Sequence, residues 1–330
     1  MNTQLSLSEH RYTSIDVVMP VFNGALYIQT AIQSVQRQTS PAARIIIADD
    51  GSTDRTVEIV TSLQQADSRI TLLMLPHAGV SAARNAGIAA SSSCYIAFLD
   101  ADDLWVPEKL ALQLAVFEAG GGEVGFVHSS YFLINEAGET LHGLHVVPPR
   151  LSGDIFKPLL LEGYVLSGSA SSVVVRREIL DKAGYFDERL FHGEDWDLWT
   201  RLAHISQVAF TPEAVVGIRV HDQSAQRRNI PGRSLKFFQQ QLLVYAKWEG
   251  LPLDAANLKA SLRKRALDAI LPLWRSPLEL VRFYRNLVLS QNVLENRLFR
   301  NFPDYALSLT RCLFMSLWKR LKRKVGLHEQ

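Results

Sequence analysis

Two acidic clusters carry residue types that could do chemistry. Asp100 and Asp102 stand one residue apart, directly after the apolar run 95–99. Carboxylates at the end of a strand can hold a hard divalent cation, which takes its remaining ligands from phosphate groups or water. A polar turn whose Asp residues cap the following helix explains the same short pattern. The first cluster alone leaves both interpretations open.

The second cluster is the segment 193–199, Gly-Glu-Asp-Trp-Asp-Leu-Trp. Asp195 and Trp199 are four residues apart, so they share one face of a helix. A carboxylate beside indole rings loses solvation, which raises its pKa and suits it to act as a general base. The alternative is a first helical turn in which Glu194 and its acidic neighbours complement the helix dipole.

Further candidate residues follow the two predicted strands 15–19 and 44–48. In open α/β sheets, ligands bind outside the carboxyl ends of the strands, so these residues are expected at one crevice with the first acidic cluster. A carboxylate there can accept the N–H of a nucleobase, although such residues also dominate ordinary turns. The residues are Pro20, Val21, Asn23 and Asp50.

Arg84 lies in a predicted helix of small residues at 80–90. Small side chains let a helix approach a sheet closely, which leaves one charged side chain able to reach a base or a diphosphate. A solvated arginine is the alternative.

The elements that must position these residues alternate between strands and helices, which is typical of βαβ units and a mostly parallel sheet. We expect a helix through 57–63 to be capped by Ser52 or Thr53. The other predicted strands are 70–75, 95–99, 124–132, 171–175 and 208–210, and the other predicted helices are 25–38, 107–118, 177–183 and one that begins near Glu194.

The composition describes a globular chain. The 330 residues are 47% hydrophobic and 21% charged, enough for one large domain or two smaller ones. Two cysteines cannot build a disulfide framework, the N-terminus does not look like a signal peptide, and no run reaches the roughly 18 apolar residues of a membrane span. We therefore expect a reduced, cytoplasmic chain. No dinucleotide-binding glycine motif follows the first predicted strand, and no P-loop or nucleophile elbow occurs.

The net charge of +2 conceals two unlike parts. Residues 1–230 hold 17 Lys and Arg against 26 Asp and Glu, whereas residues 231–330 hold 18 against 7. The basic part shows helical patterns at 233–248, 254–271, 277–289 and 304–324. The segment 305–324 is apolar and then basic, which suits contact with an anionic membrane surface. A helix packed on the protein with a solvated basic end is the alternative, and no nucleic-acid-binding motif accompanies the charge.

The ordered motifs resemble those of the family 2 glycosyltransferases, which are inverting, nucleotide-sugar-dependent enzymes of the GT-A fold. The resemblance covers about Ser14 to Ser224. It is carried by VVMPVFNGALYI, IIIADDGSTDRT, GVSAARNAGI, YIAFLDADDLWVPEKL, GYFDERL, GEDWDLWTRLA and the trailing RVHDQS.

The resemblance implies a role for each motif. Asp195 would be the general base and Glu194 would support it or contact the acceptor. Asp102 would ligate Mn²⁺ or Mg²⁺, with His221 as a second ligand, although a loop histidine that contacts phosphate explains His221 nearly as well. The implied nucleotide-sugar-binding residues are Pro20, Val21, Asn23, Asp50, Arg84, Asp100 and Asp102, and Asp103 would assist.

These inferences predict three parts of the chain: a disordered N-terminus at 1–13, a GT-A domain at 14–230 and a helical basic region at 231–330. The predicted activity is transfer of a sugar from a UDP- or dTDP-sugar to a hydroxyl of a glycan or lipid-linked acceptor, in synthesis of cell-surface polysaccharide. The basic tail predicts peripheral attachment to the cytoplasmic face of the inner membrane. A sugar-nucleotide pyrophosphorylase and a catalytically inactive, membrane-associated assembly partner are the alternatives.

Overall fold

The computed structural model describes residues 14–145, 151–163, 166, 170–221, 233–248, 260–261 and 264–265. The chain divides into two compact units, Met1–Arg228 and Asn229–Gln330. Every candidate site residue lies in the first unit. The predicted disordered segment 1–13, the predicted helices 277–289 and 304–324 and the basic segment 305–324 lie outside the described residues.

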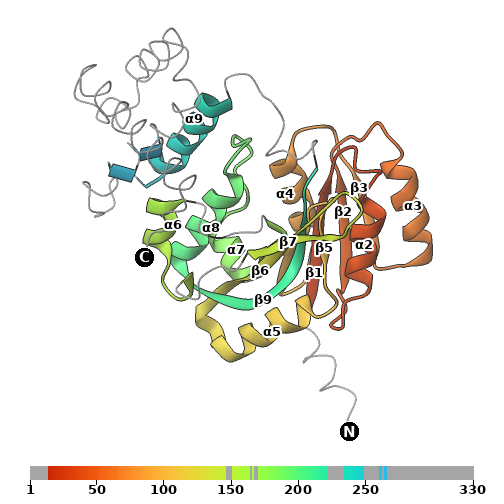
Figure 1. The fold of residues 1–330 in the computed structure, drawn as a ribbon, viewed down its shortest axis with the longest axis horizontal. Helices are drawn as coiled ribbons and strands as arrows, with labels where there is room; N and C mark the ends of the chain where they lie inside the picture. The colour runs from red at the N-terminus through yellow and green to blue at the C-terminus, as the bar shows by residue number, and fades with distance from the viewer. Residues whose placement is uncertain are drawn as a thin grey trace, which may run out of the picture. The chain divides into compact units, whose positions relative to one another are not determined.

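A nine-stranded sheet forms the centre of the first unit, in the order β3-β2-β1-β4-β8-β6-β9-β5, with β7 paired to β6 (Figure 1). The first four strands in sequence run parallel, whereas β8, β5 and β7 pair antiparallel to their neighbours. The strands are β1 (Ile15–Val21), β2 (Arg44–Asp49), β3 (Ile70–Met74), β4 (Tyr95–Phe98), β5 (Leu104–Trp105), β6 (Val124–Ile134), β7 (Thr140–His145), β8 (Val174–Arg176) and β9 (Gln207–Arg219).

The register brings the ends of the central strands to one edge. Val21 of β1 lies beside Asp49 of β2, and Val18 of β1 lies beside Phe98 of β4. All seven residues of β1 are buried, as expected of a strand covered on both faces. The segments that follow β1, β2 and β4 therefore leave the sheet at its carboxyl edge, where α/β folds bind ligands.

Helices cover both faces of this sheet (Figure 1). On one face, apolar side chains of α2 and α5 join those of the strands in one core, which includes Ile32, Ile47 and Phe117. On the other face, α4 approaches β1 so closely that a Cβ on Gly87 would lie 2.4 Å from Val18. The helices are α2 (Ile28–Gln36), α3 (Thr56–Ala66), α4 (Val80–Ala90), α5 (Lys109–Gly120), α6 (Phe156–Glu162), α7 (Arg177–Ala183) and α8 (Glu194–Ile205).

The predicted α/β class is confirmed, with corrections in detail. Neither Ser52 nor Thr53 caps α3, because the helix begins at Thr56 after Arg55, and its Thr56 N–H bonds to Asp54. The short strand predicted at 208–210 is the 13-residue β9. Pro212 and Glu213 hide its length, since they fall in an irregularity where Thr211 pairs with Ser129 and Ala214 with Ser130.

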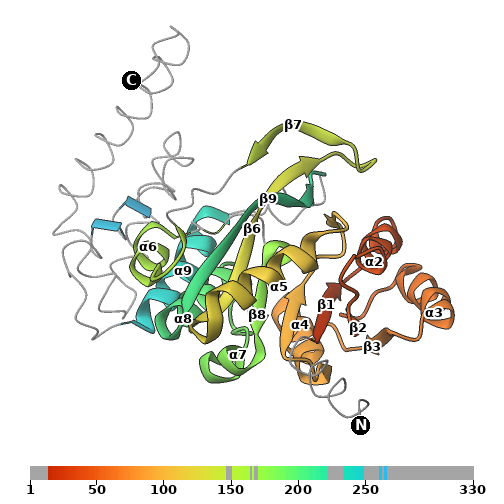
Figure 2. The same cartoon turned by 90° about the horizontal axis from the view of Figure 1, so that it is seen from below.

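The sequence patterns did not predict α6, the two-residue β5 or β7. Strand β7 pairs with β6 in a hairpin at one side of the sheet (Figure 2). In the second unit, α9 (Arg233–Ala246) falls within the predicted helix 233–248 and buries Phe238, Leu242 and Tyr245. Among the described residues, no helix is both long and apolar enough to cross a membrane.

Candidate active site

Arg84 joins the two acidic clusters. Its guanidinium donates from Nη2 to Asp100 at 2.8 Å and from Nη1 to Glu194 at 3.0 Å. Burial lowers the pKa of Arg84, but these two carboxylates outweigh that effect and raise it above its ordinary value. The charged side chain is buried, with its Cζ 5.1 Å from the centre of the Phe186 ring. The Arg84 guanidinium thus links the end of β4 to the beginning of α8.

Asp195 follows Glu194 in the first turn of α8. Gly193, at a φ of 79°, turns the chain into this helix in a conformation that suits glycine. Burial and then the charge of Glu194 raise the pKa of Asp195 to about 7, against the lowering effects of Arg84 and of the Trp196 N–H. At neutral pH this carboxylate can therefore accept a proton far more readily than an ordinary Asp.

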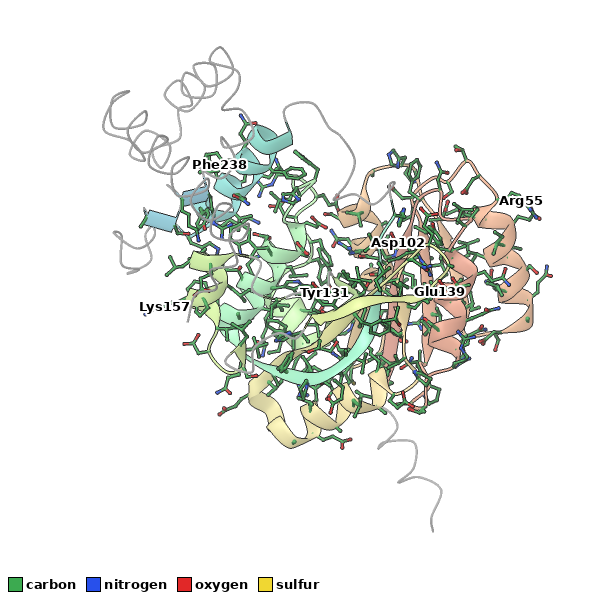
Figure 3. All side chains as sticks on the ribbon, in the orientation of Figure 1. Arg55, Asp102, Tyr131, Glu139, Lys157 and Phe238 are labelled. Atoms are coloured by element: carbon green, nitrogen blue, oxygen red, sulfur yellow. The ribbon has the colours of Figure 1, made fainter. Side chains whose placement is uncertain are left out.

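Asp102 and His221 meet at the same edge of the sheet, where Asp102 is labelled in Figure 3. The Nε2 atom of His221 lies 2.9 Å from Oδ2 of Asp102. Burial and then the Asp100 carboxylate raise the pKa of Asp102, and the hydrogen bond with His221 lowers it. The turn at residues 100–103, which contains the Asp-x-Asp sequence of Asp100 and Asp102 (the DxD turn), therefore concentrates negative charge that a cation would relieve.

The donor set fits a cation that shares its coordination with a ligand. A carboxylate oxygen and an imidazole nitrogen at hydrogen-bond distance are both ligands of Mn²⁺. Within the described ranges, no three His, Cys, Asp or Glu side chains gather as a potential metal site. Asp102 and His221 would thus supply two ligands, and a diphosphate and water would supply the others.

Asp103, the third carboxylate of the turn, faces inward instead. Its oxygens accept hydrogen bonds from Ser171 Oγ at 2.6 Å and from the Arg219 N–H at 3.0 Å. Burial, followed by the charges of Asp102 and Asp100, raises the pKa of Asp103 well above its usual range. These contacts make Asp103 part of the support beneath the turn.

Asp50 fastens the loop after β3. Its carboxylate accepts the N–H groups of Ala78 at 2.7 Å and Gly79 at 3.0 Å, and His77 Nδ1 lies 2.9 Å from Oδ2. The His77 ring also stacks on Phe22 at 4.2 Å between centres. Asp50 is thus heavily bonded within the protein, and its contact with a base stays a prediction.

Pro20 and Val21 are the last two residues of β1, and Val21 accepts the Asp50 N–H at 2.8 Å. Asn23 serves the loop after β2, since its Oδ1 accepts the N–H groups of Thr53 at 2.8 Å and Asp54 at 3.3 Å. Its contribution to a nucleotide pocket also stays a prediction.

Replacement of Asn23 should lower the free energy of unfolding, because its side chain holds the loop after β2. Asn23 has a φ of 53°, a left-handed conformation that glycine adopts freely and that strains an alanine backbone. We expect Asn23→Gly to lower the free energy of unfolding by about 1 kcal/mol through lost hydrogen bonds, and Asn23→Ala to cost about 1 kcal/mol more through backbone strain. Urea unfolding measures both, and equal losses in the two variants would contradict the strain.

Sequence reasoning missed two residues of this region. Tyr27, which precedes α2, lies with its ring centre 5.2 Å from that of His221. Arg219, which the motif match included without a role, donates to the Asp102 carbonyl at 2.7 Å. The acceptor is a backbone atom, which leaves no signal in the sequence.

Comparison with known proteins identifies the family. A family model described as "Glycosyl transferase family 2" matches residues 16–183, about half of the chain. The chain belongs to glycosyl transferase family 2. An uncharacterized glycosyltransferase of Rickettsia typhi is 30% identical over 245 residues, which cover 72% of this chain and 70% of that protein.

Other relatives differ from this chain in length. An uncharacterized glycosyltransferase of Rickettsia felis is 34% identical over 63% of this chain, and the match spans only 33% of that protein. The Escherichia coli enzyme WfgD, described as a UDP-Glc:alpha-D-GlcNAc-diphosphoundecaprenol beta-1,3-glucosyltransferase, is 31% identical over 186 residues, 56% of this chain and 68% of the enzyme.

The crystal structure of S. aureus TarS 1–349 in complex with UDP-GlcNAc matches 86% of this chain and 78% of the TarS chain, with a TM-score of 0.61 and 17% identity. This likeness concerns the fold, and it confirms the predicted GT-A architecture of the family 2 chain.

Proposed function

We propose that this chain is an inverting glycosyltransferase that moves a sugar from a nucleoside-diphosphate sugar to an acceptor hydroxyl, with Asp195 as general base. The observation that carries the proposal is the chain of contacts Asp100–Arg84–Glu194, which links the DxD turn to the residue that precedes Asp195, the carboxyl group of raised pKa. Family membership supports the reaction class.

The reaction needs only one base and no covalent intermediate. Asp195 takes the proton of the acceptor hydroxyl, and the acceptor oxygen attacks the anomeric carbon from the face opposite the diphosphate. The new carbon–oxygen bond forms while the bond to the diphosphate oxygen breaks, which inverts the anomeric configuration. Arg84 holds Glu194 at the start of α8, and in this reaction it would thereby keep the neighbouring base Asp195 in position.

Asp102 and His221 would hold Mn²⁺ or Mg²⁺, and a bound cation supplies stabilisation of the negative charge on the leaving diphosphate. The side chain of Asp102 is 35% exposed and that of His221 only 9%, so a ligand would reach the pair mainly from the side of Asp102. Asp100, fixed by Arg84, would face the ribose.

UDP is the donor nucleotide that we favour, and the thymine base of dTDP presents the same N–H edge as uracil. WfgD, described as acting with UDP-Glc on a diphosphoundecaprenol-linked sugar, supports a related lipid-linked acceptor in polysaccharide synthesis. We also propose that residues 14–230 form the catalytic domain, and that the basic residues 305–324 attach the protein to the cytoplasmic face of the membrane.

A donor screen tests the proposal. We expect Mn²⁺-dependent hydrolysis or transfer with UDP- or dTDP-sugars, at least tenfold faster than with GDP-sugars, measured as release of the nucleoside diphosphate. Addition of EDTA should abolish it. Release of pyrophosphate from a nucleoside triphosphate and a sugar phosphate would instead indicate a pyrophosphorylase, and no turnover with any donor or acceptor pool would favour an inactive partner.

A further inference from the structure

A single guanidinium, that of Arg219, ties the DxD turn to the turn of the β6–β7 hairpin. Arg219, at the end of β9, is only 5% exposed. Its Nε donates to the Asp102 carbonyl at 2.7 Å, and its Nη1 donates to the carbonyls of Asn135 at 3.0 Å and Glu136 at 2.7 Å. The last two belong to the turn of the β6–β7 hairpin, the hairpin in which Glu139 is labelled in Figure 3.

Arg219 reaches none of these segments through a salt bridge. Among the described residues, the Arg219 guanidinium forms no ion pair with a carboxylate. The main-chain N–H of Arg219 donates to Asp103. Backbone carbonyls accept its hydrogen bonds, and the Tyr27 ring lies under its Cζ at 4.5 Å. A rigid fork of donors fixes the main chain of the turn in a way that a flexible ammonium cannot.

Tyr27 extends this arrangement to His221. The centre of its ring lies 5.2 Å from that of His221, with the planes at 51°. Tyr27 thus lies between Arg219 and His221 and contacts both. The Nε2 atom of His221 in turn lies 2.9 Å from Oδ2 of Asp102. Arg219 therefore holds the main chain of Asp102, and Tyr27 packs against the ring of His221. Neither residue is itself one of the two proposed metal ligands.

We propose that Arg219 and Tyr27 are positioning residues for the divalent cation, which hold the Asp102 carboxylate and the His221 imidazole where one ion can bind both. The inference rests on the proposed function, because it takes Asp102 and His221 as the ligands. Residues that orient ligands typically change metal affinity about 10- to 100-fold when removed.

Binding of Mn²⁺ to the full-length protein, with and without UDP, tests the proposal. Electron paramagnetic resonance of free Mn²⁺ gives the Kd without any measurement of activity. We expect Arg219→Met and Tyr27→Ala each to raise the Kd about 10- to 100-fold, and Tyr27→Phe, which keeps the ring, to leave it within about twofold of the wild type.

Arg201→Met is the matched control. Arg201 also donates to three backbone carbonyls, those of Ala183, Gly184 and Tyr185, and it pairs with Asp197, but none of these groups lies in the DxD turn. Its loss should lower the melting temperature and leave the Kd for Mn²⁺ unchanged. A parallel loss of Mn²⁺ affinity in Arg201→Met would show that the effect of Arg219→Met is general destabilisation, which would overturn the inference.

Two further outcomes separate this inference from the proposed function. If Asp102→Asn abolishes Mn²⁺ binding while Arg219→Met and Tyr27→Ala bind as the wild type does, the positioning role is wrong and the metal site stands. If Asp102→Asn binds Mn²⁺ like the wild type, the metal site itself is wrong. Should Arg219→Met fail to fold, equal affinities of Tyr27→Ala and Tyr27→Phe would overturn the proposal.

Discussion

Asp195→Asn should lower the rate of sugar transfer about 10²- to 10⁴-fold while the affinity for the nucleotide-sugar stays unchanged. The amide is nearly isosteric with the carboxylate, and its oxygen can still accept the Trp196 N–H that Asp195 Oδ1 accepts at 2.7 Å. The variant therefore keeps the geometry at the start of α8 and loses only the ability to take a proton. Single-turnover transfer and donor titration measure the two effects separately.

Asp181→Asn is the control for this experiment. Asp181 lies on α7 with 46% of its side chain exposed and accepts a hydrogen bond from Tyr185. The same chemical change at this position should leave transfer within about twofold of the wild type. Survival of transfer in Asp195→Asn would exclude Asp195 as the base and direct attention to Glu194.

The pH dependence of the wild type follows from the same carboxyl group. A base acts when it is deprotonated, and the pKa of Asp195 is raised to about 7. We therefore expect kcat/KM to rise about tenfold per pH unit below pH 7 and to level off above it. In Asp195→Asn this rise should disappear, and a wild-type profile that stays flat down to pH 5 would contradict the assignment.

Much of the first unit could be predicted because local pattern and tertiary structure agree there. The helix predicted at 80–90 and the observed α4 have the same bounds, and the apolar strand 44–48 is β2 within one residue. Strand–helix alternation then places the segments after β1, β2 and β4 at one edge. The location of Asp50, Asp100 and Asp102 at this edge of the sheet was predictable for that reason alone.

The partners of the site residues could not be predicted. Arg84 was expected near a base or diphosphate, but the structure places it between Asp100 and Glu194, residues that are far apart in sequence. Asn23 bonds main-chain groups of the next loop, as Arg219 does for the DxD turn. Hydrogen bonds to backbone atoms depend on the path of the chain. Because every residue type carries the same backbone groups, the sequence does not show which residue will be the partner.

Arg84→Met should be the most destabilising single replacement in the site. It leaves the carboxylates of Asp100 and Glu194 without their counter-ion, and their side chains are only 25% and 14% exposed. Loss of one partner from a buried ion pair costs about 3–5 kcal/mol in the free energy of unfolding. By comparison, Arg189→Met removes a pair with Asp187 from an arginine that is 79% exposed, and it should cost less than about 1 kcal/mol in the same urea experiment.

Arg84→Met should also shift the pH dependence of transfer, which simple destabilisation would not do. Arg84 lowers the pKa of Asp195 whereas Glu194 raises it, so removal of the cation alone raises that pKa above about 7. The rise of kcat/KM should then move to higher pH and leave less activity at pH 7. Addition of Glu194→Gln removes one unpaired charge, so the double variant should recover part of the stability and shift the profile back toward lower pH. If Arg84→Met unfolds at the same urea concentration as the wild type and keeps its pH profile, the guanidinium does not couple the two acidic clusters.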